Sequence, residues 1–420
     1  MFKKITLKNG LRIIVVPQKS TQAVTVLVLV GTGSKYETKE ISGISHFLEH
    51  MFFKGTKKRP DNVEIAETLD KVGGIYNAFT GEDYTGYFAK VAASNFDLAL
   101  DWVSDIFLNS NLPGKEIEKE KGVIIEEINM LYDNPMAYVG LLWNKLLYGD
   151  QPAGWDIAGA KETVSAINRQ KLLDYFNNHY ISSNTIVCLA GNFKEQQAIE
   201  KTKRYFSSMR ISNPAVKQKV IDAQEQPKSL VHYKETDQTH LRLGVRGFNL
   251  FHPKRYVQDI LGNVLGGMMS SRLFIEIREK LGLAYYIKTE IESNPDTGFL
   301  VTAAGVDSKR IEKAISVILK EYKKISEEKV SPSELKKTKN NLKGRLSLSM
   351  ESSDAQASFY GIQELLEKKV MTPAEFFKEI DKVSANDMLK VAKDIFQPKN
   401  LNLVLVGPFK DNTRFEKLLA

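Results

Sequence analysis

Hydrophobic residues recur along the chain at two spacings, every second position and every third or fourth position, and stretches of the two kinds alternate. The first spacing is typical of strands and the second of amphipathic helices. Strands are predicted at residues 3–8, 11–17, 22–31, 74–80, 84–92, 184–191, 229–233, 240–248, 284–292, 297–306 and 401–406. Helices are predicted at residues 43–53, 62–72, 94–109, 114–131, 135–147, 162–165, 169–179, 255–266, 270–280, 308–327, 332–349, 353–368, 373–380 and 385–395. We therefore expect an α+β fold.

The pattern is interrupted at the middle of the chain, where residues 208–228 hold serine, asparagine, proline, glutamine and scattered charges. We interpret this stretch as a linker. After it the same order of elements returns: residues 96–107 and 311–322 each form an amphipathic helix that is followed by a short link, a proline and a long charged helix. We predict two homologous α/β domains, residues 1–207 and 229–420, each a mainly antiparallel sheet packed against helices and related by internal duplication.

The composition is that of a globular protein, with 42% hydrophobic residues and a formal charge of +8. Basic and acidic residues are mixed, and the lysine-rich run at residues 336–345 has no aromatic residue that would stack on a base, so we expect no nucleic-acid partner. The N-terminal stretch does not have the pattern of a signal peptide, and no stretch approaches membrane-spanning length. The single cysteine, Cys188, lies in an apolar strand and cannot form an internal disulfide. We expect a cytoplasmic protein without a membrane partner.

The candidate chemistry begins with the predicted helix at residues 43–53, which Ser42 is expected to cap and Gly55 to end. At about 100° per residue, one side of this helix is hydrophobic and the other carries His46, Glu49 and His50. Two histidines at i and i+4 can supply half of a tetrahedral zinc site, and the glutamate between them can take a proton from a metal-bound water. The alternative is a polar helix face that carries two histidines by chance, which in a chain with six histidines occurs on the order of one time in a hundred.

A third ligand is available in the long helix that follows Pro113. Seven residues make about 700°, close to two full turns, so Glu120 and Glu127 share a face while Glu126 points about 120° away from Glu120. The alternative is a solvent-exposed acidic stripe. Together with the two histidines, this pair supplies the missing ligand and a partner that could orient a histidine.

A hairpin is predicted at residues 74–88, with a turn at Gly81-Glu82-Asp83. An exposed hairpin edge can pair with an extended peptide through main-chain hydrogen bonds, with little regard to the peptide's sequence.

The chain resembles the family of inverted-motif zinc peptidases that includes pitrilysin, insulin-degrading enzyme and the mitochondrial processing peptidase, and in particular its short two-domain members. The resemblance covers most of the chain. The matching motifs are His46-Phe47-Leu48-Glu49-His50, which is the inverted HxxEH motif, Phe53-Lys54-Gly55-Thr56, Gly73-Gly74-Ile75-Tyr76-Asn77-Ala78-Phe79-Thr80 and Glu120-Lys121-Gly122-Val123-Ile124-Ile125-Glu126-Glu127. The chain departs from the family at residues 149–159, where a His-Pro pair is often found, and this difference affects local loop contacts rather than the zinc site.

The resemblance implies the role of each site residue. One zinc ion per chain would be bound by His46, His50 and Glu127, with Glu49 as the general base and Glu120 as a supporting acid. The family also uses an arginine and a tyrosine of the second domain to hold the substrate, which match Arg278 and Tyr285; Tyr286 competes for the second role, and strand packing is the alternative for either tyrosine. The edge strand that pairs with substrate matches Asn77, Ala78 and Phe79, although Asn77 also suits a turn or a strand edge without substrate contact.

The resemblance therefore implies a zinc-dependent metalloendopeptidase that hydrolyses peptide bonds in unfolded peptides or oligopeptides, through a zinc-bound water activated by Glu49. A homodimer is expected, because larger relatives close four such domains around a chamber. The alternative is a non-catalytic structural subunit of the same fold in a larger assembly. Cleavage preference, substrate length, and the choice between precursor processing and peptide clearance remain open.

Overall fold

The computed structural model describes residues 2–419, which form two compact units that are each discontinuous in sequence. The first unit contains the residues up to 128 together with 156–218 and 347–371. The second unit contains residues 129–155, 219–346 and those from 372 onward. The chain therefore crosses between the units several times.

The first unit is built on a 6-stranded sheet in the order β1-β2-β6-β3-β5-β4. Its strands are β1 (Lys3–Thr6), β2 (Arg12–Pro17), β3 (Ala23–Val30), β4 (Ile75–Thr80), β5 (Thr85–Ala92) and β6 (Thr185–Gly191). All neighbours are antiparallel except β2 and β6. Successive side chains of β2 enter opposite cores, Ile13 and Val15 on one face of the sheet and Ile14 and Val16 on the other. Burial on both faces explains why the central strands are hydrophobic throughout.

The second unit is built on a 5-stranded sheet in the order β7-β11-β8-β10-β9. Its strands are β7 (Lys228–Tyr233), β8 (Gln238–Arg246), β9 (Ala284–Ser293), β10 (Gly298–Asp307) and β11 (Leu401–Gly407). Only β7 and β11 pair in parallel. This order matches that of the first sheet without β1. The strands β7, β11, β8, β10 and β9 take the places of β2, β6, β3, β5 and β4. The predicted fold class, two α+β units with mainly antiparallel sheets, is confirmed.

The helices follow the predicted order. In the first half of the sequence they are α1 (Ile44–Met51), α2 (Asn62–Asp70), α3 (Phe96–Asn109), α4 (Gly114–Asp133), α5 (Pro135–Tyr148), α6 (Lys161–Ser165), α7 (Arg169–His179) and α8 (Glu195–Tyr205). In the second half they are α9 (Arg255–Gly266), α10 (Ile311–Glu327), α11 (Pro332–Ser349), α12 (Ser353–Leu366), α13 (Pro373–Lys382), α14 (Ala385–Ile395) and α15 (Thr413–Leu419). Helices α8 and α15 were not predicted, and the helix predicted at 270–280 is instead a π-helix, η6, over Phe274–Lys280.

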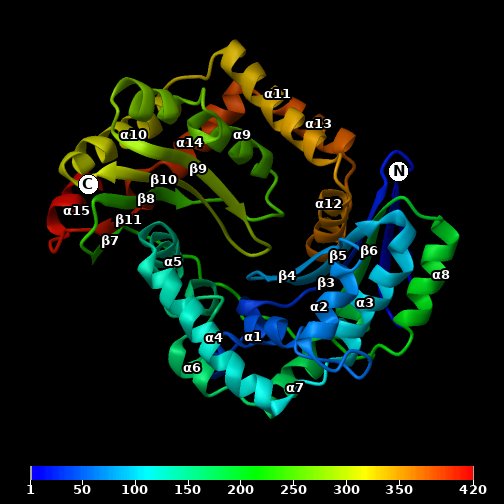
Figure 1. Cartoon of the computed structure of the whole chain (residues 1–420). Coiled ribbons are helices and arrows are strands. Elements are labelled where there is room, and N and C mark those ends of the chain that lie inside the picture. The colour runs from blue at the N-terminus through cyan, green and yellow to red at the C-terminus, as the bar shows by residue number, and fades with distance from the viewer. Residues whose placement is uncertain (1, 420) are drawn as a thin grey trace. The chain divides into compact units, whose positions relative to one another are not determined.

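Two helices are exchanged between the halves of the sequence. Each belongs to one half of the sequence but packs on the sheet that is formed by the other half. Helix α12 covers β3 and β6 of the first unit, and α5 covers β11 and β8 of the second (Figure 1). The apolar side of α12 packs through Ala357, Tyr360 and Leu365. This exchange is why the compact units are not continuous ranges. The division of the sequence into homologous domains at 208–228 stays a prediction, although residues 208–227 form neither helix nor strand.

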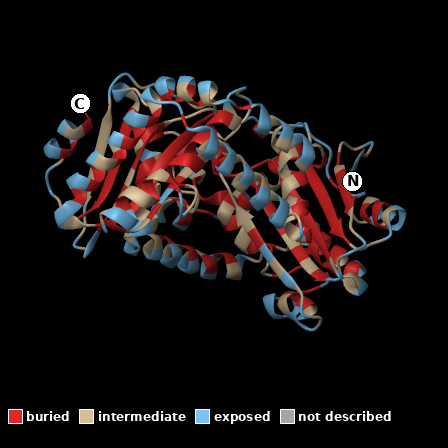
Figure 2. Cartoon of the chain, turned by 90° about the horizontal axis from the view of Figure 1, so that it is seen from above, coloured by how far each residue is buried: buried red, intermediate tan, exposed pale blue. Residues whose placement is uncertain are grey.

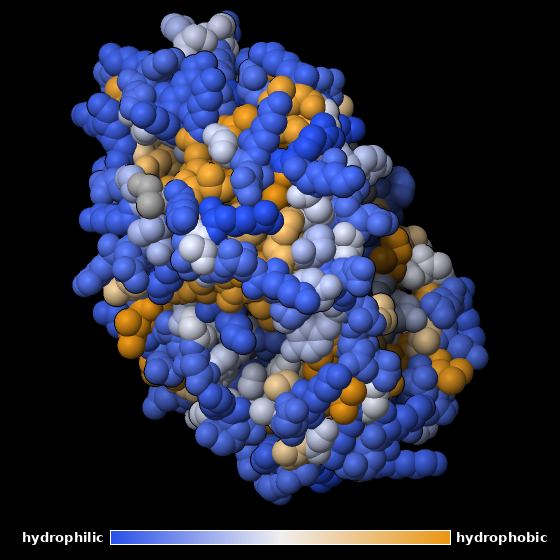
Figure 3. Space-filling view, turned by 90° about the vertical axis from the view of Figure 1, so that its left-hand side faces the viewer, coloured by the Kyte–Doolittle hydropathy of each residue, from blue (hydrophilic) through white to orange (hydrophobic). Residues whose placement is uncertain are grey.

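The buried residues are concentrated in the strands and on one side of most helices, whose other side is exposed (Figure 2). Hydrophilic side chains cover most of the face shown in Figure 3, with hydrophobic side chains gathered in patches between them. Within residues 2–419 no helix combines the length and apolar character that crossing a membrane requires.

Candidate metal centre

Helix α1 carries the two histidines on its polar side. Its other side is formed by Ile44, Phe47, Leu48 and Met51, which are fully buried in the core of the first unit. His46, Glu49 and His50 are only partly buried. The hydrophobic side therefore fixes the rotation of the helix, and the polar side is left to face other polar groups.

The start of α1 differs from the prediction, because Ser42 does not cap it. The N-cap residue is Gly43, which adopts a left-handed conformation with φ 94°, and no side chain of its own caps the helix. The carboxylate of Glu37 takes this place: it accepts hydrogen bonds from the backbone N–H groups of Gly43 at 2.7 Å and Ser45 at 2.8 Å. Burial raises the pKa of Glu37 to about 8, against the lowering effect of these hydrogen bonds. The oxygens of a carboxyl group at this end of a helix satisfy N–H groups that have no partner within the helix.

Three side chains of the first unit converge on one point: His46 and His50 of α1, and Glu127 of α4. The two Nε2 atoms are 3.2 Å apart, and Glu127 Oε2 lies 3.7 Å from that of His46 and 3.6 Å from that of His50. Ligand atoms at 2.0–2.2 Å from a tetrahedral zinc ion lie about 3.3–3.6 Å from each other. The three atoms are therefore spaced as zinc ligands are, and two imidazoles with one carboxylate form a donor set that suits zinc.

Glu120 fixes the orientation of His50. Its Oε1 atom lies 3.0 Å from His50 Nδ1, and its Oε2 atom lies 2.7 Å from the Lys54 ammonium. Burial alone would raise the pKa of Glu120, but the hydrogen bonds from His50 and Lys54 outweigh it and lower the pKa. An ionised carboxylate on Nδ1 keeps the proton on that nitrogen and leaves Nε2 free to bind a metal.

His46 is held in its neutral form. Burial, and then the neighbouring His50, lower the pKa of His46 to about 4. Because a metal binds the neutral imidazole, no proton has to be displaced from this side chain at neutral pH.

Glu49 points from α1 toward the last residue of β4. The hydroxyl of Thr80 donates a short hydrogen bond to Glu49 Oε2. Burial raises the pKa of Glu49, and the hydrogen bond from Thr80 and the charge of His50 oppose this rise. A carboxylate beside the metal ligands with a raised pKa is suited to accept and return a proton.

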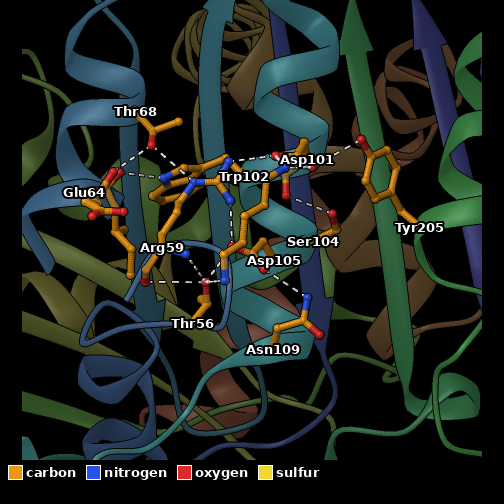
Figure 4. A network of polar contacts seen from close by, with 12 residues as sticks. Thr56, Arg59, Glu64, Thr68, Asp101, Trp102, Ser104, Asp105, Asn109 and Tyr205 are labelled. Atoms are coloured by element: carbon orange, nitrogen blue, oxygen red, sulfur yellow. Dashed lines mark hydrogen bonds and ion pairs between the residues drawn. The ribbon is translucent and has the colours of Figure 1, made fainter. Parts of the chain in front are cut away.

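The loop that follows α1 is fastened to α3 by a buried ion-pair network (Figure 4). Arg59 bonds Asp105 at 2.6 Å and Asp101 at 2.7 Å, and the Thr56 hydroxyl donates to Asp105 at 2.7 Å. Thr56 also accepts from the backbone N–H of Arg59 at 2.9 Å. These contacts hold the C-terminal end of α1 against the core, as Glu37 holds its beginning.

Strand β4 is an edge strand of the first sheet. Its side chains alternate, so that Ala78 is buried in the core on the α1 side while Asn77 is exposed. The Asn77 side chain accepts a hydrogen bond from the backbone N–H of Ala78 at 2.9 Å. Phe79 packs edge-on against Tyr84, with their ring centroids 6.0 Å apart. The strand therefore offers backbone groups on its outer edge.

Arg278 and Tyr285 lie in the second unit, on η6 and at the start of β9. The Arg278 guanidinium stands over the Tyr285 ring at 5.9 Å and over Phe274 at 4.8 Å. Tyr285 is 76% exposed. The hydroxyl of Tyr286, in contrast, lies 3.0 Å from His240 Nδ1, and its ring stacks on that histidine. Of the two tyrosines, Tyr285 is therefore the one available to a ligand.

Several residues of the site were not singled out from the sequence. Lys54 and Thr80 lie inside motifs that carry the family resemblance, and the motifs contained the signal although no role could be read from them. Glu37 precedes α1 by several residues, and no spacing rule connects it with the helix that it caps.

Comparisons with known proteins show to which family and fold the chain is similar. A family model described as Insulinase (Peptidase family M16) matches residues 12–161, and one described as Peptidase M16 inactive domain matches residues 166–342. The uncharacterized zinc protease YmxG of Bacillus subtilis (strain 168) is 36% identical over 412 residues, which cover 97% of this chain and 98% of that protein. The crystal structure of a protease from Helicobacter pylori has a TM-score of 0.91 at 25% identity and covers 97% of this chain and 99% of that one. A chain of Complex III2 from Candida albicans shares the fold, with a TM-score of 0.84 at 18% identity over 100% of this chain and 99% of its own length.

Proposed function

The chain belongs to peptidase family M16 and is a zinc metallopeptidase, and on that premise we propose that it is an endopeptidase that cleaves unfolded peptides. One observation carries the proposal. The Nε2 atoms of His46 and His50 and the Oε2 atom of Glu127 lie 3.2, 3.6 and 3.7 Å from one another, with Glu49 on the same side of α1. We propose that these three side chains hold one zinc ion per chain.

The zinc ion would supply a Lewis acid that polarises the scissile carbonyl and lowers the pKa of water. Glu49 accepts the proton of the attacking water and returns it to the leaving amine, for which a carboxyl with a raised pKa is suited. Glu120 keeps the imidazole of His50 in the tautomer whose Nε2 atom is free.

The substrate would bind to β4. Because this strand has a neighbour in the sheet only on the β5 side, an extended peptide can pair with its outer edge. Backbone pairing requires an extended chain, which favours unfolded peptides over folded proteins. In this proposal Asn77, Ala78 and Phe79 contact the substrate.

Arg278 and Tyr285 are proposed to hold the substrate from the second unit. The support is the exposure of the Tyr285 ring, 76%, and the cation–π contact that orders Arg278 over it. Tyr286 is not proposed for this role because its hydroxyl lies within hydrogen-bond distance of His240.

The second candidate function is that of a non-catalytic subunit in a larger assembly. The family model that matches residues 166–342 is described as an inactive domain, and this description is compatible with a non-catalytic subunit. The convergence of His46, His50 and Glu127 favours the peptidase. The homodimer and the cytoplasmic location stay predictions, and sedimentation of the zinc-loaded protein tests the first: an active monomer would contradict it.

The experiment is cleavage of a mixed pool of unstructured peptides, read by mass spectrometry, for the wild type and Glu49→Gln, with the zinc content of each measured. We expect Glu49→Gln to bind zinc with unchanged stoichiometry and to lose about 10³-fold in turnover. Cleavage sites within the peptides, rather than at their ends, would establish an endopeptidase. An active Glu49→Gln variant would refute the role of Glu49, and a zinc-loaded wild type that cleaves nothing would favour the structural subunit.

A further inference from the structure

The hydroxyl of Thr80 makes a direct contact with the proposed general base. Thr80 is the last residue of β4, and its Oγ1 atom donates to Glu49 Oε2 in a short hydrogen bond. Among the residues that the structure describes, it is the one hydrogen-bond donor to the Glu49 side chain. Hydrogen bonds to ionised carboxylates are stronger and more directional than those between neutral groups.

The alternation of β4 explains why Thr80 reaches Glu49. Tyr76 and Ala78 face the core that contains the hydrophobic side of α1, while Phe79 packs on the opposite face of the sheet. Thr80 lies two residues after Ala78, so its side chain is on the same face of the sheet and points toward α1. The hydroxyls of the buried residues Tyr87 and Tyr180 are 3.0 Å apart and bond to each other rather than to Glu49.

The backbone that follows Thr80 is firmly anchored. The N–H of Gly81 donates to Tyr84 O at 2.8 Å, and its carbonyl accepts from Ser34 N at 3.2 Å. The ammonium of Lys35, which is 1% exposed, lies 3.3 Å from the buried carboxylate of Asp83. The turn is therefore fixed on the first unit, and the free part of the hairpin is the outer edge of β4.

We propose that Thr80 is a positioning residue that sets the carboxylate of Glu49 in the orientation for proton transfer. This inference rests on the proposed function, because it takes Glu49 as the base and β4 as the strand that binds the peptide. Thr80 then connects the two: the strand that pairs with the substrate ends in the residue that holds the base.

Thr80→Val and Thr80→Ser separate the hydroxyl from the rest of the side chain. Valine keeps the shape and strand preference of threonine but has no donor. Serine keeps the donor and loses only the methyl group. We expect Thr80→Val to lower kcat by about 10²-fold with KM changed less than about threefold, since a displaced base costs rate rather than affinity. We expect Thr80→Ser to retain kcat within about threefold.

Zinc content and the thermal midpoint are measured for all three proteins, so that loss of metal or unfolding is recognised. Thr80→Ala, which also lacks the donor, replaces Thr80→Val if that variant is unfolded. The inference is overturned if the variant without the hydroxyl keeps the wild-type kcat, if Thr80→Ser falls as far as Thr80→Val, or if the loss is entirely in KM. In each of these outcomes the wild type still cleaves peptides, so the proposed function stands. A zinc-loaded wild type without activity would refute the proposed function and this inference with it.

Discussion

Helices α1 and α9 occupy the same place in the two units, since α1 follows β3 and α9 follows its counterpart β8. On α1 the polar, partly buried side carries His46, Glu49 and His50. On α9 nearly every residue from Val257 to Gly266 is buried, and the helix lies directly against β9. A Cβ atom on Gly266 would come within 2.5 Å of the backbone nitrogen of Thr289. The same topology thus holds a polar site in one unit and a closed backbone contact in the other.

The long helices α4 and α11 show the same contrast. On α4, Glu120 and Glu127 face the histidines of α1. On α11, Lys339 donates to the carbonyl of Asp381 at 2.9 Å and Lys343 to its carboxylate at 2.8 Å, so these side chains hold α13. The comparison shows that a shared strand order supplies equivalent positions in the two units, while the residues on two helix faces decide whether those positions can bind a metal.

The largest effect is expected when the metal site of the first unit is broken. Glu127→Gln replaces a charged ligand oxygen by a weaker neutral one, and we expect the Kd for zinc to rise at least about 10³-fold, about 4 kcal/mol. Glu126→Gln is the matched control, because its side chain is one residue away and not among the three that converge. Zinc titration against a chelating competitor measures both. Equal losses in the two variants would contradict the assignment of Glu127.

A second prediction concerns the closed contact in the second unit. Gly266→Ala should lower the free energy of unfolding by about 2 to 3 kcal/mol, because α9 must move away from the backbone of β9. Gly122→Ala on α4 is the control: apart from the adjacent residues and the helix's own backbone, no atom lies within 4 Å of its added Cβ, so the variant should be more stable by about 0.5 to 1 kcal/mol through helix propensity. Urea midpoints measure both changes. An unchanged free energy of unfolding in Gly266→Ala would contradict the prediction that stability depends on the close approach of α9 to β9.

The strands and most helices could be predicted because each depends on local periodicity, and the ligand set His46, His50 and Glu127 was implied by the family resemblance. Strand β3 reads as a continuous hydrophobic run, and the spacing of Glu120 and Glu127 follows from helix geometry alone. Helix α8 escaped prediction because few of its residues are hydrophobic and only Ala198, Ile199 and Thr202 are buried.

Other features depend on contacts between distant residues. Periodicity gives the apolar side of α5 but not which sheet it covers, and the structure places it on the second sheet. The prediction that Ser42 caps α1 was wrong because the actual cap also depends on a contact between separated residues. Ser42 has a suitable residue type, but the buried carboxyl group of Glu37 accepts hydrogen bonds from the N–H groups at the start of the helix instead. The role of Thr80 also required the position of α1 beside β4.

A third prediction uses the histidine at the end of α7 in the first unit. Burial lowers the pKa of His179 to about 4, whereas in the unfolded chain it is about 6.5. Between these values the unfolded chain binds more protons, so His179 reduces the free energy of unfolding as the pH falls, by about 2 kcal/mol between pH 7 and pH 5. His179→Gln should remove this part of the pH dependence, measured by urea unfolding in a chelator. An NMR pKa near 6.5 for His179 in the folded protein would contradict the prediction.

The smallest effect is expected on β9, the counterpart of β4, where two adjacent tyrosines differ in their surroundings. If Tyr285 holds the substrate, Tyr285→Phe removes a hydroxyl from an exposed ring and should lower kcat/KM about tenfold, about 1.4 kcal/mol, without changing zinc affinity. Tyr286→Phe is the control, since its hydroxyl lies beside His240 and its loss should affect stability more than catalysis. Arg278→Lys should act like Tyr285→Phe, because lysine keeps the charge but lacks the planar group that stands over the ring. If Tyr286→Phe instead carries the loss in kcat/KM, the tyrosine beside His240 and not the exposed one contributes to catalysis, and the contrast between a polar site in the first unit and a closed contact in the second no longer holds.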